Sequence, residues 1–286
     1  MAKAKRGFPP AATPTPAKET SLMERLRYRW HLVATFLLIV VGSAIIWAMT
    51  SFSGLEVEDL NYEVVAVYPH DPGAFTQGLL YHDGALYEST GQYGESSIRK
   101  VELKTGKVLE ITPLADSFFA EGLTMVGDQF YQLTWKSGVG FVYNISLQPV
   151  RQFEYDGEGW GLVYDGRYLI MSDKSATLRF HDPETMRLER NLPIKYGQSA
   201  VPEINEMEYV EGQLFVNVWK RDYIYRIDLN SGQVTGRINL GNLLSLEERP
   251  QQSDDGSLNG IAYNPESGTF YVTGKRWPKL FEIRLK

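Results

Sequence analysis

Gln77-Gly78-Leu79, followed by a turn and by Ala85-Leu86-Tyr87, is the first of five copies of one pattern in this 286-residue chain. The other copies are Glu121-Gly122-Leu123 with Gln129-Phe130-Tyr131, Trp160-Gly161-Leu162 with Arg167-Tyr168-Leu169, Asn205-Glu206-Met207 with Gln213-Leu214-Phe215, and Asn259-Gly260-Ile261 with Thr269-Phe270-Tyr271. Their starts lie 39 to 54 residues apart, a spacing that suits a four-stranded antiparallel blade. The sequence therefore predicts an all-β fold, a five-bladed β-propeller over residues 56–286.

The ends of the repeat region indicate how the ring closes. Outer hairpins are predicted at residues 98–112 and 224–239, each around a turn that contains glycine. The last copy has only three strands, ending at residues 280–285, whereas residues 62–68 form a strand without a partner. We expect this early strand to complete the last blade, since a closed ring leaves no long exposed edge.

Two positions of each repeat should meet at one end of the central channel. The first ring position, at the entry of each innermost strand, holds Gln77, Glu121, Trp160, Asn205 and Asn259. The second ring position, at the far end of the first hairpin, holds Gly91, Trp135, Lys174, Trp219 and Lys275.

These side chains differ from blade to blade, which a channel filled for stability alone does not explain, because buried amides and carboxylates are costly unless paired. A merely solvated channel is the alternative. Taken singly, Trp135 and Trp219 also fit core positions, and Lys275 fits a solvated surface position. Their equivalence in the repeat is the argument for a shared site.

The N-terminal region divides into a tail and a candidate membrane span. Residues 1–29 form a basic, Pro-rich tail, and residues 30–55 contain no Asp, Glu, Lys or Arg. The apolar run is long enough for a transmembrane signal anchor. Seven basic residues precede it, so the positive-inside rule places the N-terminus in the cytoplasm and the propeller on the periplasmic or extracytoplasmic side of the cell membrane. A cleaved signal peptide is the alternative reading.

Composition excludes several classes of function. After residue 55 the chain has 22 basic and 33 acidic residues, an excess of negative charge that argues against nucleic acid as a partner. The sequence has no cysteine, which excludes disulfides, thiol nucleophiles and Cys-based metal sites. The four histidines lie outside the ring positions, so no zinc site is predicted. A monomer is expected.

Residues 62–286 contain a series of short motifs: Phe75-Thr76-Gln77-Gly78-Leu79, Tyr87-Glu88-Ser89-Thr90-Gly91, Ala120-Glu121-Gly122-Leu123, Leu133-Thr134-Trp135, Ile204-Asn205-Glu206-Met207-Glu208-Tyr209, Asn217-Val218-Trp219, Leu258-Asn259-Gly260-Ile261-Ala262-Tyr263 and Thr273-Gly274-Lys275 with Trp277. In this order and spacing they resemble the glutamine cyclotransferase family of plants and bacteria. The resemblance implies a five-bladed propeller that converts the N-terminal glutamine of peptides and proteins to pyroglutamate and releases ammonia. It also implies pocket roles for Phe75, Gln77, Glu121, Trp135, Trp160, Asn205, Trp219 and Lys275.

Within that function, roles follow from side-chain chemistry. Glu121 is the only carboxylate at the two ring positions, so it is predicted to transfer the proton. Lys275, with Asn205 or Gln77, would stabilise the oxyanion. Trp135, Trp160, Trp219 and Phe75 would form a dry box around the substrate glutamine.

No metal or cofactor is expected in catalysis, although the sequence leaves open a structural cation in the channel. Two alternatives remain. One is a non-catalytic envelope propeller that binds peptides or proteins in the same aromatic box. The other is a calcium-dependent, lactonase-like propeller, which would gather more acidic ligands at the channel than Glu121 alone.

Overall fold

The computed structural model describes residues 22–51, 56–250 and 256–286. Contacts divide the chain into two units, Met1–Gly54 and Leu55–Lys286. Most of the predicted tail, residues 1–21, lies outside the described residues, as do residues 52–55 of the predicted span.

The first unit contains one helix, α1 (Leu22–Ser51). Within it, the hydroxyl groups of Thr35 and Ser43 donate to the carbonyl oxygens four residues earlier, at 2.8 and 2.7 Å. In the part of the chain that the structure describes, no helix reaches the combination of length and apolar character that crossing a bilayer requires. The membrane anchor at residues 30–55 therefore stays a prediction.

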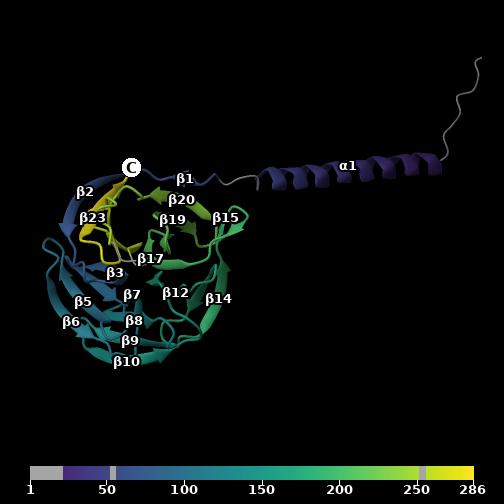
Figure 1. Cartoon of the computed structure of the whole chain (residues 1–286). Coiled ribbons are helices and arrows are strands. Elements are labelled where there is room, and N and C mark those ends of the chain that lie inside the picture. The colour runs from purple at the N-terminus through teal and green to yellow at the C-terminus, as the bar shows by residue number, and fades with distance from the viewer. Residues whose placement is uncertain (1–21, 52–55, 251–255) are drawn as a thin grey trace, which may run out of the picture. The chain divides into compact units, whose positions relative to one another are not determined.

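The second unit confirms the predicted five-bladed propeller. From the axis outward, the first blade consists of β3 (Thr76–His82), β4 (Ala85–Thr90), β5 (Ser97–Glu102) and β6 (Val108–Pro113), and the second of β7 (Ala120–Val126), β8 (Gln129–Thr134), β9 (Val139–Asn144) and β10 (Pro149–Glu154). The third blade consists of β11 (Leu162–Tyr164), β12 (Leu169–Met171), β13 (Thr177–His181) and β14 (Leu188–Pro193), and the fourth of β17 (Ile204–Val210), β18 (Gln213–Val218), β19 (Tyr223–Asp228) and β20 (Val234–Asn239). The fifth blade consists of β21 (Leu258–Asn264), β22 (Thr269–Gly274), β23 (Lys279–Leu285) and β2. Figure 1 shows β3, β7 and β17 around the centre and β6, β10 and β14 at the periphery.

The ring closes as predicted from the sequence. Strand β2 (Tyr62–Pro69) pairs antiparallel with β23, from Tyr62 opposite Leu285 to Pro69 opposite Lys279, and forms the outer strand of the fifth blade. Just before it, β1 (Glu58–Asp59) pairs in parallel with β20 at the edge of the fourth blade. The segment 58–69 thus joins the outer edges of the last two blades. A small hairpin, β15 (Lys195–Tyr196) and β16 (Ser199–Ala200), lies between blades three and four in the sequence.

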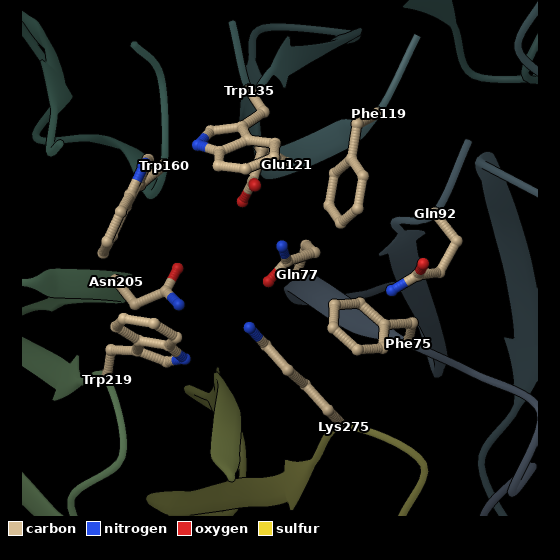
Figure 2. A pocket seen from close by; sticks show the side chains of 10 residues that line it. All are labelled: Phe75, Gln77, Gln92, Phe119, Glu121, Trp135, Trp160, Asn205, Trp219 and Lys275. Carbon is tan, nitrogen blue, oxygen red and sulfur yellow. The ribbon is translucent and has the colours of Figure 1, made fainter. Parts of the chain in front are cut away.

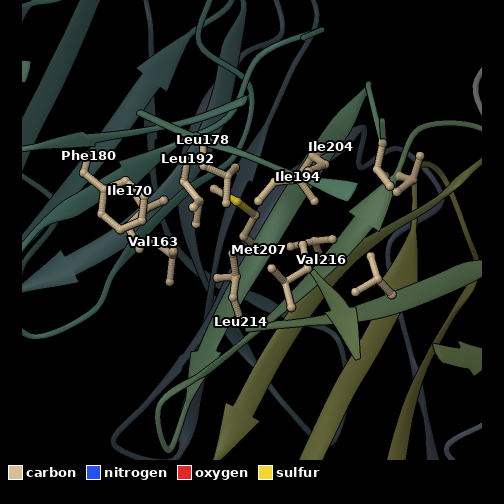
Figure 3. Packing of buried hydrophobic residues seen from close by; sticks show 14 residues of the cluster. Val163, Ile170, Leu178, Phe180, Leu192, Ile194, Ile204, Met207, Leu214 and Val216 are labelled. Atoms are coloured by element: carbon tan, nitrogen blue, oxygen red, sulfur yellow. The ribbon is translucent and has the colours of Figure 1, made fainter. Parts of the chain in front are cut away.

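Apolar side chains fill the spaces between neighbouring blades. Among the described residues, five buried clusters occur, and each combines side chains of two adjacent blades. Figure 3 shows the cluster between the third and fourth blades, in which Phe180 and Ile170 pack toward Met207 and Leu214. Because the apolar positions of each strand face these seams, burial of the seams holds the ring together.

Glycines in the repeat allow the innermost strands to approach one another closely. A Cβ atom on Gly122 would lie 2.4 Å from the backbone nitrogen of Leu162, and one on Gly161 would lie 1.9 Å from the carbonyl oxygen of Asn205. The fourth blade has Glu206 at this position. Its carboxylate accepts the backbone N–H groups of Ile261 and Leu79, at 2.6 and 3.4 Å, and so links the inner strands of three blades.

Candidate active site

The innermost strands carry an irregularity at the point where they enter the channel. The pairing register shifts between Thr76 and Gly78, between Ala120 and Leu123, and between Ile204 and Met207. Such a bulge leaves a residue out of the ladder and redirects its side chain. The residues at these bulges are Gln77, Glu121 and Asn205, which explains why the first ring position can present polar groups to the channel.

The second ring position lies in the turn after the second strand of each blade. The backbone N–H of Trp135 donates to the carbonyl of Phe119 at 2.9 Å, and that of Lys275 donates to Ser257 at 3.0 Å. Trp219 makes the same bond to Glu203 at 2.9 Å. Each of these residues is therefore held beside the segment that precedes the entry of its own blade.

One cavity of about 240 Å³ brings all eight predicted site residues together. Its lining consists of Phe75, Gln77, Gln92, Phe119, Glu121, Trp135, Trp160, Asn205, Trp219 and Lys275. Figure 2 shows the Glu121 carboxyl group and the Lys275 ammonium group directed toward the centre from opposite sides. The placement is observed, whereas the catalytic and binding roles of these residues remain predictions.

Aromatic rings make up most of the cavity wall. Trp160 and Trp219 meet edge to face at 6.0 Å, and Phe119 lies 5.9 Å from Phe75 and 5.6 Å from Trp135, measured between ring centroids. The rings come from four blades, so their mutual contacts fix the width of the opening. Such a wall excludes water and strengthens electrostatic interactions inside the cavity.

Glu121 is buried, with 4% of its surface exposed, and its Oε2 atom has no hydrogen-bond partner among the described residues. Burial raises the pKa of the Glu121 carboxyl group well above its usual value, because an unpaired charge is poorly solvated there. The positive charge of Lys275 acts in the opposite direction, and the negative charge of Glu158 raises the pKa further. The site thus contains a buried carboxyl group whose affinity for a proton is raised.

Lys275 is also buried, with 5% exposed, and its Nζ atom lies 4.8 Å from the centroid of the Phe75 ring. Gln77 accepts a hydrogen bond from Asn259 at 3.1 Å through its amide oxygen, which leaves its amino group as the donor. The Oδ1 atom of Asn205 has no partner within the described ranges. The cavity therefore offers an ammonium group and two amides around one carboxyl group.

Comparison with known proteins agrees with this arrangement. The glutamine cyclotransferase family matches residues 37–285. A glutaminyl-peptide cyclotransferase of Arabidopsis thaliana is 41% identical over 245 residues, which cover 84% of this chain and 77% of that protein. The crystal structure of Myxococcus xanthus glutaminyl cyclase matches with a TM-score of 0.73 and 35% identity, over 81% of this chain and 99% of that chain.

The chain belongs to the glutamine cyclotransferase family. The family predicted from the sequence motifs is thereby confirmed. In this member of the family, three of the ten residues at the ring positions stay out of the cavity. They are Gly91, Lys174 and Asn259.

Each of the three has a physical reason for its position. Gly91 provides room for Phe119, because a Cβ atom on it would lie 2.4 Å from the Phe119 ring. The Lys174 side chain is 71% exposed and pairs with Glu158 at 3.6 Å. Asn259 is buried behind Gln77 and donates to it and to the Thr76 carbonyl.

Sequence reasoning missed Phe119, Gln92 and Glu158. Glu158 accepts the indole N–H groups of Trp135 and Trp160, at 3.3 and 3.2 Å, and so holds two walls of the cavity in place. A signal for two of these residues exists in the repeat. Phe119 and Glu158 stand two residues before the entry of their blades, at the position that Phe75 has in the first blade.

A second group of polar and charged residues is linked to the cavity wall through Thr76, which stands between Phe75 and Gln77. This group, called the Glu88 cluster below, consists of His70, Asp71, Thr76, Glu88 and Arg99. Glu88 is 1% exposed and accepts hydrogen bonds from Thr76 at 2.6 Å and from Arg99 at 2.8 Å. Burial by itself would raise the pKa of Glu88, but Arg99, His70 and Thr76 outweigh it and lower the pKa to about 2.

No group of three or more His, Asp or Glu side chains suited to a metal ion is found in the described part of the chain. Glu206 and Glu208 lie on the inner strand β17, and their oxygens accept backbone N–H groups. The structural cation that the sequence leaves open stays a prediction.

Proposed function

We propose that this protein converts the N-terminal glutamine of peptides and proteins to pyroglutamate in the central cavity, with Glu121 as the proton-transfer group and without a metal ion. Membership of the family assigns it to the glutaminyl-peptide cyclotransferases, which are enzymes. The observation that carries the site assignment is the unpartnered Oε2 atom of buried Glu121 in a cavity walled by aromatic rings.

The cavity suits a single small side chain. Its volume of about 240 Å³ is below the range of about 300–1,000 Å³ that is usual for drug-sized ligands. The rings of Trp160, Trp219 and Phe75 would enclose the glutamine side chain and fold its γ-carboxamide toward its own α-amine. Holding the two reacting groups together is the proximity effect, which contributes up to about 7–11 kcal/mol in well-oriented reactions.

The reaction requires one proton to move between two nitrogens. As the α-amine attacks the γ-carbonyl carbon, Glu121 accepts a proton from the amine nitrogen. It then donates a proton to the amide nitrogen, the bond from that nitrogen to the γ-carbon breaks, and ammonia leaves. The raised pKa of the Glu121 carboxyl group favours the first transfer, because a carboxylate with a higher pKa is a stronger base toward the amine proton.

The tetrahedral intermediate carries negative charge on the former carbonyl oxygen. Lys275, with the amino group of Gln77 or the amide of Asn205, would stabilise this oxyanion. No step in this scheme uses a metal ion.

We also propose that the protein is a monomer anchored in the cell membrane, with a cytoplasmic N-terminus and the propeller on the periplasmic or extracytoplasmic side. The charge distribution around residues 30–55 supports this topology. Protease added to intact spheroplasts that express the chain should remove the propeller. Protection of the propeller there, with digestion after lysis, would contradict the topology.

Ammonia release tests the catalytic proposal. The purified full chain is incubated with a Gln-initiated peptide, with the same peptide acetylated at its α-amine, and with the free peptide plus a metal chelator. We expect ammonia and a pyroglutamyl product from the free peptide with or without chelator, and none from the acetylated peptide. Absence of ammonia from the free peptide would favour the peptide-binding propeller, and loss of activity with chelator would contradict the metal-free mechanism.

A further inference from the structure

The mouth of the cavity is basic although the propeller as a whole is acidic. We define the mouth positions as the second ring position and the residue that follows it in each blade: Gly91-Gln92, Trp135-Lys136, Lys174-Ser175, Trp219-Lys220 and Lys275-Arg276. These ten residues include five cations and no acid, whereas the chain after residue 55 has 22 basic and 33 acidic residues. The local charge is therefore opposite in sign to that of the rest of the propeller.

Besides Lys275, three of these cations lie over aromatic rings that line the cavity. The Nζ atom of Lys136 is 3.8 Å from the centroid of Trp135, and that of Lys220 is 4.5 Å from the centroid of Trp219. The guanidinium carbon of Arg276 is 5.7 Å from the centroid of Phe75. Because a cation is attracted to the face of an aromatic ring, these contacts keep the three charges beside the opening.

Two of these three residues also have an unusual backbone conformation. Lys220 and Arg276 have φ angles of 57° and 59°, in the left-handed region that non-glycine residues rarely adopt. Both directly follow the second ring position of their blade, so the same unusual conformation recurs at equivalent places. Unfavourable backbone conformations tend to cluster at functional sites, where the surrounding structure maintains them.

Two of these cations, Lys136 and Arg276, form no ion pair with an acidic residue in the described part of the chain. Glu158 is turned toward the indoles of Trp135 and Trp160 and pairs with Lys174. Glu203, in the segment before the fourth blade, lines a different cavity together with Arg221.

We infer that the mouth selects peptides that carry an acidic residue directly after the N-terminal glutamine, and that Lys136 and Arg276 bind the carboxylate of that residue. This inference rests on the proposed function, in which glutamine fills the cavity and the next residue emerges at the mouth. Opposite charges at the mouth would favour approach and binding of such peptides, with a strong dependence on ionic strength.

The test compares three peptides that differ only in the second residue, Gln-Glu, Gln-Ala and Gln-Lys, with the full chain. At low salt, kcat/KM should be about fivefold higher for Gln-Glu than for Gln-Ala, and about fivefold lower for Gln-Lys, as expected for charge pairs of roughly 1 kcal/mol each. At about 1 M salt, where the Debye length falls to about 3 Å, the three values should converge. Equal values at low salt would overturn the inference. Failure of Gln-Ala itself to react would instead overturn the proposed function.

Variants then assign the effect to the mouth. The double variant Lys136→Gln/Arg276→Gln should react with Gln-Ala at close to the original rate and lose most of the preference for Gln-Glu. Lys100→Gln is a matched control, since Lys100 also lies over an aromatic ring, Tyr87 at 5.6 Å, but belongs to β5 and not to the mouth positions. An undiminished preference in the double variant, or an equal loss in the control, would show that these residues do not read the second position.

Discussion

Glu121 and Glu88 are both buried carboxyl groups in neighbouring blades, yet their surroundings have opposite effects on them. Glu88 is surrounded by Arg99, His70 and Thr76, which lower its pKa to about 2. Glu121 has an oxygen without a partner among the described residues, and burial raises its pKa. The difference separates a carboxylate that holds the structure together from a carboxyl group that is available for chemistry.

The two groups are linked through the chain. Thr76, which donates to Glu88, stands between Phe75 and Gln77 of the cavity wall. His70 contacts Glu88 through Nε2 at 3.1 Å and the carbonyl of Trp277 through Nδ1 at 2.6 Å, and Trp277 follows Lys275 by two residues. The Glu88 cluster therefore connects the segment of Phe75 and Gln77 to the segment of Lys275.

The strongest challenge to this comparison is Glu121→Gln. The substitution keeps the size of the side chain and removes the transferable proton, so kcat should fall by about 10²–10⁴-fold. The melting temperature should not decrease, because no paired charge is lost. Ammonia release and thermal unfolding are measured on the same preparation. Retention of the full rate would remove Glu121 from the mechanism.

Glu88→Gln should show the opposite behaviour. The change leaves the buried Arg99 without its carboxylate, and breaking a buried pair costs about 3–5 kcal/mol, or a melting temperature lower by about 10 °C. Because the folded pKa of Glu88 is lowered to about 2, its contribution is present above about pH 4.5 and is lost as the pH falls toward 2. The variant should therefore differ most from the original protein at neutral pH and least in acid. A difference that is the same at pH 7 and pH 3 would contradict the assignment.

Glu158→Gln tests how a neighbouring charge affects Glu121 in the cavity. The amide can still accept an indole N–H group, but the negative charge that raises the pKa of Glu121 is gone. The limb of the pH–rate profile that reports Glu121 should shift to lower pH, and KM should rise about tenfold as the bonds to Trp135 and Trp160 weaken. Glu203→Gln is the control, since Glu203 has the equivalent position in the next blade but lines a different cavity. Equal profiles for the two variants would argue against a role for the Glu158 charge.

The smallest effect is expected from Glu208, a third carboxyl group, on β17. Burial raises its pKa to about 8, and the N–H group of Tyr263 donates to it at 3.1 Å. The folded state thus keeps a proton that the unfolded chain releases above about pH 4.5, so stability falls as the pH rises from about 4.5 to 8. Glu208 is only half-buried, so solvent screens much of this effect, and Glu208→Gln should raise the melting temperature at pH 8 by about 2–4 °C, and less at pH 5. Thermal unfolding at both pH values checks this, and a stabilisation that is larger at pH 5 would contradict it.

The sequence was sufficient for the blades and for most of the cavity, because a repeat aligns equivalent positions without knowledge of their contacts. Glu121, Trp160 and Asn205 occupy one column of that alignment, and the structure brings them together. The pairing of β2 with β23 followed from counting strands.

What the repeat could not indicate depends on how individual blades deviate from it. Strands β11 and β12 have only three residues each, and Lys174, in the turn after them, is directed to solvent. The roles of Phe119 and Glu158 depend on neighbouring blades, since Phe119 fills the space beside Gly91 and Glu158 reaches Trp135. The Glu88 cluster likewise combines residues from β3, β4, β5 and the preceding loop, which no spacing rule brings together.

The pairing of β2 with β23 has a consequence for biosynthesis. Strand β2 leaves the ribosome more than two hundred residues before β23 does. It therefore has no pairing partner while the other four blades form. The native ring is then completed only after translation has reached the last residues, in a step of high contact order that is expected to be slow. A ribosome stalled before residue 279 would carry an open ring with two unsatisfied edges, which a chaperone would have to shield from neighbouring chains.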